Sequence, residues 1–323
     1  MREHRVLVIT SREDPHADYV IQKCNQLDLG DAIVRLNTED FLSNCEIRFD
    51  GDLFELDILD SGRHLCSGDV SAVWFRRPQE FALSGDDPDT ARFLLEEGTE
   101  ALRGLYFALH DSARWVNPLP NLHRARNKMQ QMQAARREGF DVPRTLVTNS
   151  AEEAASFCKE VGYICTKSLK NPYIISEGRM HPWFTRMVSL DELESNAASI
   201  ARCPILLQEY VDKVFDLRII VMGDEVIPFR IDSQENTLSQ TDVRGASPHL
   251  IRHGPYQLPA SVDRAVRSFV RRQGLAFSAI DVAVGRDGRY YFLENNPNGQ
   301  WLWLELLTGA RLSDALIRLL FAD

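Results

Sequence analysis

Cysteines are few, and none is placed as a metal ligand. Six are scattered over 323 residues, with no Cys-x-x-Cys pair. Their spacing is typical of no zinc site, and in a long chain it indicates reduced thiols that are mostly buried. The cysteines that we expect to be free are Cys24, Cys45, Cys66, Cys158, Cys165 and Cys203.

Long hydrophobic runs are also absent. Near the N-terminus only four apolar residues occur together, from Val6 to Ile9, whereas a secretory signal needs about 7–15. No run approaches the roughly 20 residues that span a bilayer. Both absences predict a cytoplasmic protein without a membrane-spanning segment.

Positive charge is in deficit. The chain has 37 Lys and Arg against 47 Asp and Glu, so its formal net charge is −10, which argues against nonspecific nucleic-acid binding as its main role. The basic stretch from Arg124 to Lys128 is an exception, and a phosphate-bearing small ligand would explain it. With 44% hydrophobic and 26% charged residues, the composition is that of a globular protein of one large domain or two to three small ones.

The first part of the chain has the pattern of an α/β domain. An apolar strand at 6–9, a helix and a second strand at 32–36 form a β-α-β start. The turn Gly51-Asp52 separates two alternating runs and predicts a hairpin. The proline-rich segment 115–120 is typical of a joint between domains, so we predict an N-terminal α/β domain at residues 1–115. Two further elements expected in it are a strand at 72–75 and a helix at 90–110.

The remainder has a mixed α+β pattern, which we divide into a central subdomain at 116–203 and a C-terminal subdomain at 204–323. In the central part Pro143 marks an edge strand, because proline cannot donate to a ladder, and Asn149-Ser150 cap a helix. In the C-terminal part a hairpin turns at Gly223-Asp224. The other expected elements are helices at 123–138, 151–161, 191–201, 260–273 and 311–321, strands at 142–148, 163–168, 205–221, 226–230, 280–284 and 290–294, and a hairpin with Gly178.

The last hairpin brings two carboxylates together. If Asp287-Gly288 is a two-residue turn, counting back along both strands makes Val282 face Leu293 and Asp281 face Glu294. Like charges directly opposite one another destabilise a sheet. This pair therefore needs a raised pKa or a bound cation.

An amide oxygen falls on the same face as the two acids. Asn296 lies two residues beyond Glu294, and side chains alternate along a strand. Three hard oxygen ligands favour Mg²⁺, which completes its shell with water and nucleotide phosphate oxygens. We therefore predict Asp281, Glu294 and Asn296 as metal ligands. The alternative is an exposed hairpin with solvated acids, which the apolar run around Asp281 disfavours.

Cationic side chains lie where they would bind the phosphates of a nucleotide. Lys167 is inside a β-run, where a charged residue either extends to solvent or faces a polar cavity. Lys128 lies on the basic helix and could equally belong to a solvated face. Arg218 and Arg230 would stabilise charge in phosphoryl transfer, although singly each is more often a surface ion pair. The strand 206–212 becomes polar at its end, which suits backbone contacts to a purine or an ordinary strand end.

In order and spacing these residues resemble the ATP-grasp superfamily of carboxylate–amine or carboxylate–thiol ligases, over most of the chain. The phrases that carry this resemblance are Asn127-Lys128, the Lys167 strand, Gln208-Glu209-Tyr210-Val211, Asp216-Leu-Arg218, Asp281-Val and Glu294-Asn-Asn296-Pro297. Within the superfamily, the ligases that mature microviridin-type peptides, the graspetides, are the most similar. That similarity rests on the phrases Val73-Trp-Phe-Arg-Arg-Pro78, Asn127-Lys-Met-Gln-Gln-Met, Gly139-Phe-Asp-Val-Pro-Arg-Thr-Leu-Val-Thr-Asn149 and Pro228-Phe-Arg-Ile-Asp232.

The resemblance implies an ATP-grasp fold, ATP and Mg²⁺ as cofactors, and a role for each matching residue. Lys128 and Lys167 would bind ATP phosphates, and Arg218 and Arg230 would face the phosphates and an acyl phosphate. The expected metal ligands match the magnesium ligands of the family, with Glu294 bridging two ions. The residues expected around adenine and ribose are Gln208, Glu209, Tyr210, Val211 and Asp216. The segment 168–178 holds one glycine, so no long glycine-rich phosphate loop is predicted.

The function implied by this resemblance is ATP-dependent macrocyclisation, in which side-chain ω-ester or ω-amide links close within a ribosomal precursor peptide. Its leader would dock on 171–187 and 191–201, unless that region is only a lid. Arg76 and Arg77 would hold an acidic core peptide or have a structural role. We also expect a possible homodimer. The alternatives are a ligase that adds amino acids to a peptide or protein, and a nucleotide-binding regulator; the Trp-Phe-Arg-Arg-Pro phrase disfavours the first, and the complete set of lysines and acids the second.

Overall fold

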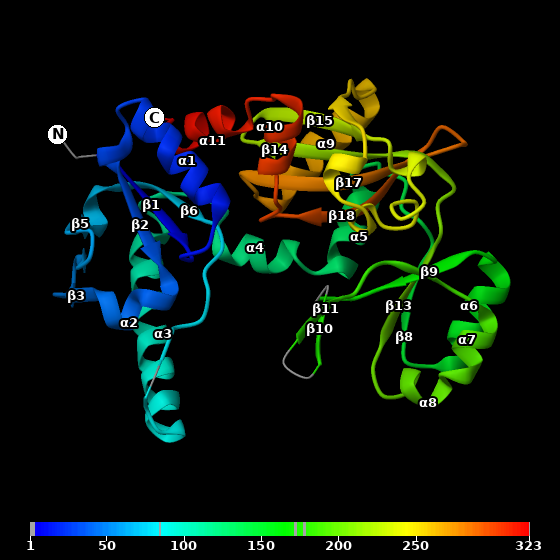
Figure 1. Ribbon diagram of the computed structural model, residues 1–323, viewed down its shortest axis with the longest axis horizontal. Coiled ribbons are helices and arrows are strands. Elements are labelled where there is room, and N and C mark those ends of the chain that lie inside the picture. The colour runs from blue at the N-terminus through cyan, green and yellow to red at the C-terminus, as the bar shows by residue number, and fades with distance from the viewer. Residues whose placement is uncertain (1–3, 84, 171–172, 177–178, 323) are drawn as a thin grey trace. The chain divides into compact units, whose positions relative to one another are not determined.

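The computed structural model describes residues 4–83, 85–170, 173–176 and 179–322 and has a mixed α/β fold (Figure 1). The chain forms two compact units, each assembled from segments that are far apart in the sequence. The first unit comprises residues 1–119, 274–277 and 311–323, and the second comprises residues 120–273 and 278–310. The predicted division into 1–115, 116–203 and 204–323 stays a prediction.

A four-stranded parallel sheet forms the centre of the first unit. Its strands, in the order β2-β1-β6-β7, are β1 (Arg5–Thr10), β2 (Ile33–Asn37), β6 (Val70–Phe75) and β7 (Arg114–Val116). The run Val6 to Ile9 is almost wholly buried, as expected of a parallel strand covered on both faces. Helix α1 (Pro15–Gln26) begins after Asp14, whose carboxylate accepts a hydrogen bond from the His16 N–H. The expected β-α-β start is confirmed.

The C-terminal helix also belongs to the first unit. Helix α11 (Leu312–Leu320) packs on α1 and β6, and Lys23 on α1 forms an ion pair with Asp314. The expected hairpin at Gly51-Asp52 is confirmed as β3 (Cys45–Phe49) and β4 (Phe54–Ile58). The other elements of this unit are α2 (Phe41–Asn44), α3 (Pro88–His110), β5 (Arg63–Cys66), and the 3-10 turns η1 (Gly30–Ala32), η2 (Thr38–Asp40) and η3 (Ser67–Asp69). Strands β5 and β7 were not predicted, and β7 includes the start of the proline-rich segment.

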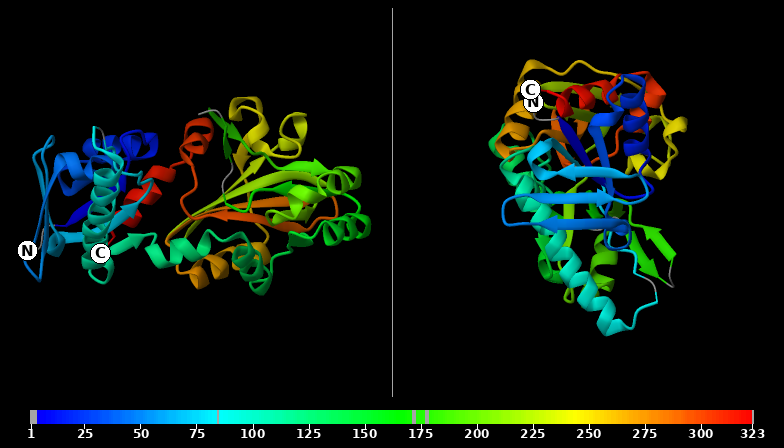
Figure 2. Two further views of the ribbon diagram at one scale, coloured as in Figure 1. Left: turned by 90° about the horizontal axis from the view of Figure 1, so that it is seen from below. Right: turned by 90° about the vertical axis from the view of Figure 1, so that its left-hand side faces the viewer.

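The second unit contains a five-stranded sheet with two helices packed against it (Figure 2). In the order β16-β15-β14-β17-β18, its strands are β14 (Lys213–Met222), β15 (Glu225–Ile231), β16 (His253–Pro255), β17 (Phe277–Gly285) and β18 (Tyr290–Asn296). Helices α5 (Lys128–Arg137) and α9 (Ala260–Gln273) lie next to one another. Between helix and sheet, the Phe269 and Phe292 rings pack in a tilted arrangement with centroids 5.2 Å apart, and Phe140 contacts both rings.

A second, four-stranded antiparallel sheet completes this unit, in the order β12-β9-β13-β8. Its strands are β8 (Thr145–Thr148), β9 (Ile164–Lys167), β12 (Arg186–Val188) and β13 (Ile205–Glu209). Strand β8 lies at the edge, as Pro143 predicts. The helices packed on this sheet are α6 (Ala151–Val161), which Ser150 caps, α7 (Leu190–Ser195) and α8 (Ala197–Ile200).

Three predicted elements are each divided in two. The basic helix at 123–138 is α4 (Leu119–Ala125) followed by α5, because Asn127 caps a new helix by accepting the Gln130 N–H. The helix at 191–201 is interrupted at Asn196, between α7 and α8. The strand at 205–221 ends as β13 in the four-stranded sheet, and β14 then begins in the five-stranded one. These short links contain no proline or glycine, and the N-cap signal of Asn127 was not used in predicting the helix.

The remaining elements of the second unit are short. They are β10 (Tyr173–Ser176), β11 (Arg179–Pro182), α10 (Leu302–Thr308), and the 3-10 turns η4 (Ser233–Glu235), η5 (Val243–Gly245) and η6 (Pro248–Leu250). Strands β10 and β11 form the expected hairpin, although Gly178 itself lies outside the described residues. All six cysteines are free, as predicted. Among the described residues, no helix is both long and apolar enough to cross a membrane.

Candidate active site

Asp281 and Glu294 face one another across β17 and β18, as predicted. The register that produces this pairing differs from the predicted one. Val282 faces Phe292 rather than Leu293, because a β-bulge interrupts the ladder between Asp281 and Val282.

The turn of this hairpin is also longer than the predicted two residues. Val284 pairs with Tyr290, one position off the predicted register, and the Gly285 N–H donates to the Arg289 carbonyl. The bulge then shifts the register back by one position. The two deviations cancel, so the carboxylates meet although the predicted hairpin geometry is wrong.

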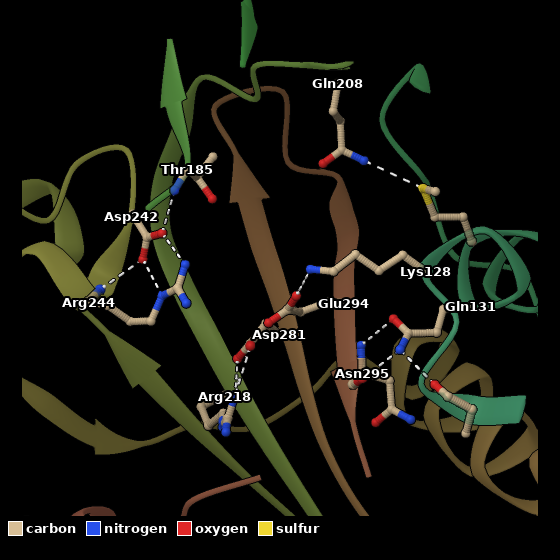
Figure 3. A network of polar contacts seen from close by, with 12 residues as sticks. Lys128, Gln131, Thr185, Gln208, Arg218, Asp242, Arg244, Asp281, Glu294 and Asn295 are labelled. Atoms are coloured by element: carbon tan, nitrogen blue, oxygen red, sulfur yellow. Dashed lines mark hydrogen bonds and ion pairs between the residues drawn. The ribbon is translucent and has the colours of Figure 1, made fainter. Parts of the chain in front are cut away.

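Two lysines act on Glu294. Lys128 is the first residue of α5, and its Nζ lies 2.7 Å from Glu294 Oε2 (Figure 3). Lys167 ends β9; burial lowers its pKa, Glu294 opposes this shift and the Lys128 charge adds to it. Burial acts to raise the pKa of Glu294, but the Lys128 and Lys167 charges hold that pKa below its usual range. Glu294 is therefore ionised at neutral pH, in a cluster with both predicted phosphate-binding lysines.

Arg218 holds the other carboxylate. From β14 its Nη1 donates to both oxygens of Asp281, at 2.8 and 2.7 Å, and its Nη2 donates to the Gln300 carbonyl. Burial raises the pKa of Asp281; the Arg218 charge opposes this shift, and the Glu294 charge adds to it. Arg218, Asp281, Glu294 and Lys128 thus lie in a row, with the two carboxylates between the two cations (Figure 3). Below we call these four residues the charge row.

The third predicted metal ligand lies at the end of β18. Asn296 is exposed, and its Oδ1 accepts the Asn298 N–H at 3.1 Å. It is two residues beyond Glu294, so the alternation of the strand gives both side chains the same side. The amide oxygen is available there together with the two carboxylates.

Gln131 is a residue that the sequence reasoning missed. Its buried amide pairs with the edge strand β18: Oε1 accepts the Asn295 N–H at 3.0 Å, and Nε2 donates to the Asn295 carbonyl at 2.7 Å. The same Nε2 donates to the Ala125 carbonyl at 2.7 Å. These bonds fix α5 against β18, and Lys128 lies one turn earlier on that helix. In the sequence, Gln131 lies within the phrase Asn127-Lys-Met-Gln-Gln-Met, which supports the family resemblance but was given no role of its own.

The four residues expected around adenine lie at the link between the two sheets: Gln208, Glu209, Tyr210 and Val211. Gln208 is buried, and its Nε2 donates to Thr145 Oγ1 at 2.9 Å. The Tyr210 hydroxyl donates to the Gln240 carbonyl at 3.4 Å, and burial raises its pKa. The link thus has the polar strand end that the sequence predicts, while the role of these residues in binding adenine stays a prediction.

Asp216, expected near the ribose, is buried in an internal network. Its Oδ2 lies 2.7 Å from Lys213 Nζ and accepts the Ser233 hydroxyl at 2.5 Å. Both partners are buried as well. In this structure the carboxylate anchors the start of η4 to β14, and its ribose contact stays a prediction.

Arg230 is held apart from the charge row. Its Nε donates to Asp232 Oδ1 at 2.6 Å, and its guanidinium lies 4.1 Å from the centroid of the Phe215 ring. Within the described part of the chain it makes no ion pair with Asp281 or Glu294. The structure therefore groups Arg218, but not Arg230, with the carboxylates.

Arg244 is a second residue that the sequence reasoning missed. It lies on η5, and its Nε and Nη2 donate to Asp242, at 2.9 and 2.6 Å (Figure 3). Asp242 also accepts the Thr185 N–H at 2.8 Å. The bond to Asp242, and beyond it the charges of Glu294 and Asp281, raise the pKa of Arg244. A fourth cation, after Lys128, Lys167 and Arg218, therefore acts on the carboxylate pair, from a loop in which the sequence shows no motif.

Arg76 and Arg77 belong to the first unit, whereas every other predicted site residue belongs to the second. Arg76 is buried after β6, with Nε 3.7 Å from Asp14 Oδ2, and burial lowers its pKa. Arg77 is exposed. Their role in substrate binding stays a prediction.

Comparison with known families covers nearly the whole chain. Residues 125–320 match the family model described as a RimK-like ATP-grasp domain. Residues 5–123 match the model described as an MvdD pre-ATP grasp domain. Among curated proteins, the alpha-aminoadipate–LysW ligase LysX of Sulfolobus acidocaldarius is 28% identical over 197 residues, which are 57% of this chain. The match spans 64% of the length of that ligase.

Two solved structures agree over almost their full length. A RiPP-associated ATP-grasp ligase of Chryseobacterium gregarium, in complex with ADP and a leader and core peptide, is 26% identical with a TM-score of 0.88. That alignment covers 98% of this chain and 96% of the ligase. The macrocyclase MdnC of Microcystis aeruginosa, bound with the precursor peptide MdnA, is 28% identical with a TM-score of 0.85. It covers 99% of this chain and 100% of MdnC.

Proposed function

The chain belongs to the RimK-like ATP-grasp family, and from that membership we propose that it is an ATP-dependent ligase that closes side-chain ω-ester or ω-amide links within a ribosomal precursor peptide. A peptide Asp or Glu carboxylate attacks the γ-phosphorus of ATP, and the bond between this phosphorus and the β,γ-bridging oxygen breaks. The products are ADP and an acyl phosphate on the peptide. A Ser or Thr hydroxyl or a Lys amine of the same peptide then attacks the acyl carbon. Phosphate leaves, the nucleophile loses its proton, and each link removes one water from the peptide mass.

The charge row is the observation that carries this proposal. Lys128 and Lys167 act on Glu294, and Arg218 and Arg244 also act on the carboxylate pair. Phosphoryl transfer depends on positioned charge rather than on covalent help from the protein. Cations already held in place by carboxylates supply that charge with little rearrangement.

The same carboxylates fit a magnesium ion. Two facing carboxylates and the Asn296 amide oxygen are hard donors of the kind that Mg²⁺ prefers. A cation there would offset the Glu294 charge that helps raise the pKa of Asp281. Asp281, Glu294 and Asn296 would hold the ion, which when bound would neutralise phosphate charge.

A peptide substrate is supported by the two structural relatives, whose solved complexes contain a leader and core peptide or a precursor peptide. We place leader docking on 171–187 and 191–201. Residues 171–172 and 177–178 of this region lie outside the described residues. The described part exposes Tyr173 and Met180 on the β10–β11 hairpin, side chains suited to an apolar contact. The exposed Arg77 is the better placed of the two first-unit arginines to meet an acidic core.

Mass spectrometry tests the proposal. A candidate precursor with a core of Ser, Thr or Lys and acidic residues is incubated with the protein, ATP and Mg²⁺, beside Asp281→Ala and Glu294→Ala controls. We expect successive losses of one water per link, with the wild-type protein only. An unchanged precursor mass together with ADP release would contradict macrocyclisation.

One observation favours a second function. The match to LysX, named as a ligase of alpha-aminoadipate and LysW, favours addition of a free amino acid to a protein. That activity would add the mass of an amino acid less one water to the acceptor, rather than remove water. The same spectrum therefore separates the two ligases, and absence of ADP under every condition would instead favour a regulator.

A further inference from the structure

Exposed arginines lie on α5, on α9 and just before α5, and the proposed reaction leaves them unused. The sequence assigned the stretch from Arg124 to Lys128 to a phosphate-bearing ligand, but only Lys128 reaches the carboxylates, while Arg124 and Arg126 are exposed. The two helices lie side by side (Figure 2), and Gln130 Nε2 donates to Gln273 Oε1 at 3.2 Å between them. Seven exposed arginines lie on these helices and just before α5, and we call the five without an ion pair in the described ranges the arginine face: Arg126, Arg136, Arg137, Arg264 and Arg271.

Charge is distributed very unevenly between this surface and the rest of the chain. Residues 119–137 contain five Lys and Arg and no Asp or Glu, and α9 contains four Arg and one Asp. The whole chain nevertheless has a net charge of −10. The arginine face is therefore a local positive field on an acidic protein.

The arginine face differs from two neighbouring arginines of α9, which form ion pairs. Arg267 Nε lies 2.8 Å from Asp263 Oδ2, and Arg272 Nε lies 3.2 Å from Glu138 Oε1. None of the five side chains of the arginine face has an ion pair or hydrogen bond with any residue in the described ranges. An anionic partner would therefore pair with guanidinium groups that no carboxylate in the described ranges already neutralises.

We propose that the arginine face docks an acidic segment of the peptide substrate, which rests on the proposed function for the identity of that peptide. A guanidinium group binds a carboxylate through two parallel hydrogen bonds. The arginine face contains arginines and no lysine, which suits carboxylate binding. A nucleic acid would extend beyond the face over the acidic remainder of the chain, which would repel it. A short acidic segment stays within the positive field.

Docking of this kind acts on binding and not on the chemical step. None of the five arginines contacts the charge row. A tethered segment raises the effective concentration of the reacting part of the same peptide. Loss of the face should therefore raise KM for an acidic substrate and leave kcat unchanged.

Fluorescence anisotropy with the full-length protein tests the proposal. The probe is a labelled twelve-residue peptide of alternating Glu and Ser, and the matched control peptide carries Gln in place of Glu. We expect the Glu peptide to bind at least tenfold more tightly at low salt and to lose at least tenfold in affinity between 50 and 300 mM salt, as charge-driven association does.

Single charge reversals locate the site. Arg137→Glu and Arg271→Glu should each weaken Glu-peptide binding at least fivefold, and Arg202→Glu, an equal reversal at another exposed arginine, should change it less than twofold. Equal binding of the Gln peptide, or no effect of the reversals, would overturn the proposal. So would tighter binding of a twelve-nucleotide single-stranded DNA through the same arginines, or conversion of a dimer to a monomer by either reversal.

The outcomes separate this surface from the ligase proposal. If the Glu peptide binds through the arginines but the protein never converts a precursor, the docking proposal stands and the proposed function is wrong. If rings form and both reversals leave KM unchanged, the proposed function stands and the docking proposal is wrong.

Discussion

At the scale of single residues, the two facing carboxylates have opposite pKa shifts. Burial raises the pKa of Asp281, with the Glu294 charge adding to it, while the lysine charges hold the pKa of Glu294 low. An ionised Asp281 therefore costs folding free energy, and Glu294 contributes stability that is lost as pH falls through its lowered pKa. Such opposed shifts are typical of functional sites, where stability is given up for chemistry.

Asp281→Asn should separate stability from activity. The raised pKa means that the wild-type protein gains stability from protonated Asp281 at low pH and loses it as pH rises through that pKa. The amide keeps an acceptor for Arg218 without the charge. We expect equal stability near pH 3.5 and a higher free energy of unfolding for the variant at pH 7, with ADP release reduced about 10²–10³-fold. Denaturant unfolding across pH checks the first part, and a lower stability of Asp281→Asn at pH 7 would contradict it.

At the scale of elements, α5 positions Lys128 because Gln131 pairs with the edge of β18. The Gln131 amide completes backbone bonds that an edge strand otherwise leaves open. The helix and the strand are thereby fixed at the residue next to Glu294. The lysine–carboxylate distance depends on this contact as well as on the two side chains.

Gln131→Glu should loosen that contact. The carboxylate would face two carbonyl acceptors, those of Ala125 and Asn295, in a buried site. We expect a loss of about 1–3 kcal/mol in unfolding free energy and a raised KM for ATP, because Lys128 is displaced from Glu294. The control is Gln133→Glu, the same change on the exposed side of the same helix, which should alter neither. If Gln131→Glu loses stability but its KM for ATP is unchanged, Gln131 has a structural role and does not position Lys128.

The sequence predicted elements well where local signals agree and failed where tertiary contacts decide. Helix α9 and the Ser150 cap were predicted because their periodicity and capping chemistry are local. The division between β13 and β14 was not predicted, because only the pairing with neighbouring strands determines which sheet β13 and β14 join. Asp281 met Glu294 because a longer turn and a bulge compensated each other. Arg244 lies in a loop without a motif, and the phrase that contains Gln131 indicated the family but not the contact with β18, because loop position and edge pairing depend on the folded chain.

At the scale of the whole molecule, the first unit depends on both ends of the chain. Residues 311–323 return to it after the second unit is complete, and α11 packs on α1 and β6. Three leucines of α11 are almost fully buried: Leu312, Leu316 and Leu320. The buried core of the first unit therefore includes side chains of α11 as well as those of the N-terminal strands.

Leu316→Ala should weaken the first unit and leave the charge row intact. The side chain is fully buried, so truncation should cost about 2–5 kcal/mol. The control Leu306→Ala on α10 is two-thirds exposed at 66% and should change stability by less than about 0.5 kcal/mol. We expect a lower first unfolding transition by calorimetry in Leu316→Ala, with stabilisation by ADP retained, because the residues proposed to bind the nucleotide phosphates, adenine and ribose belong to the second unit. If ADP no longer stabilised the variant, nucleotide binding would require the first unit as well, and the site would not be a property of the second unit alone.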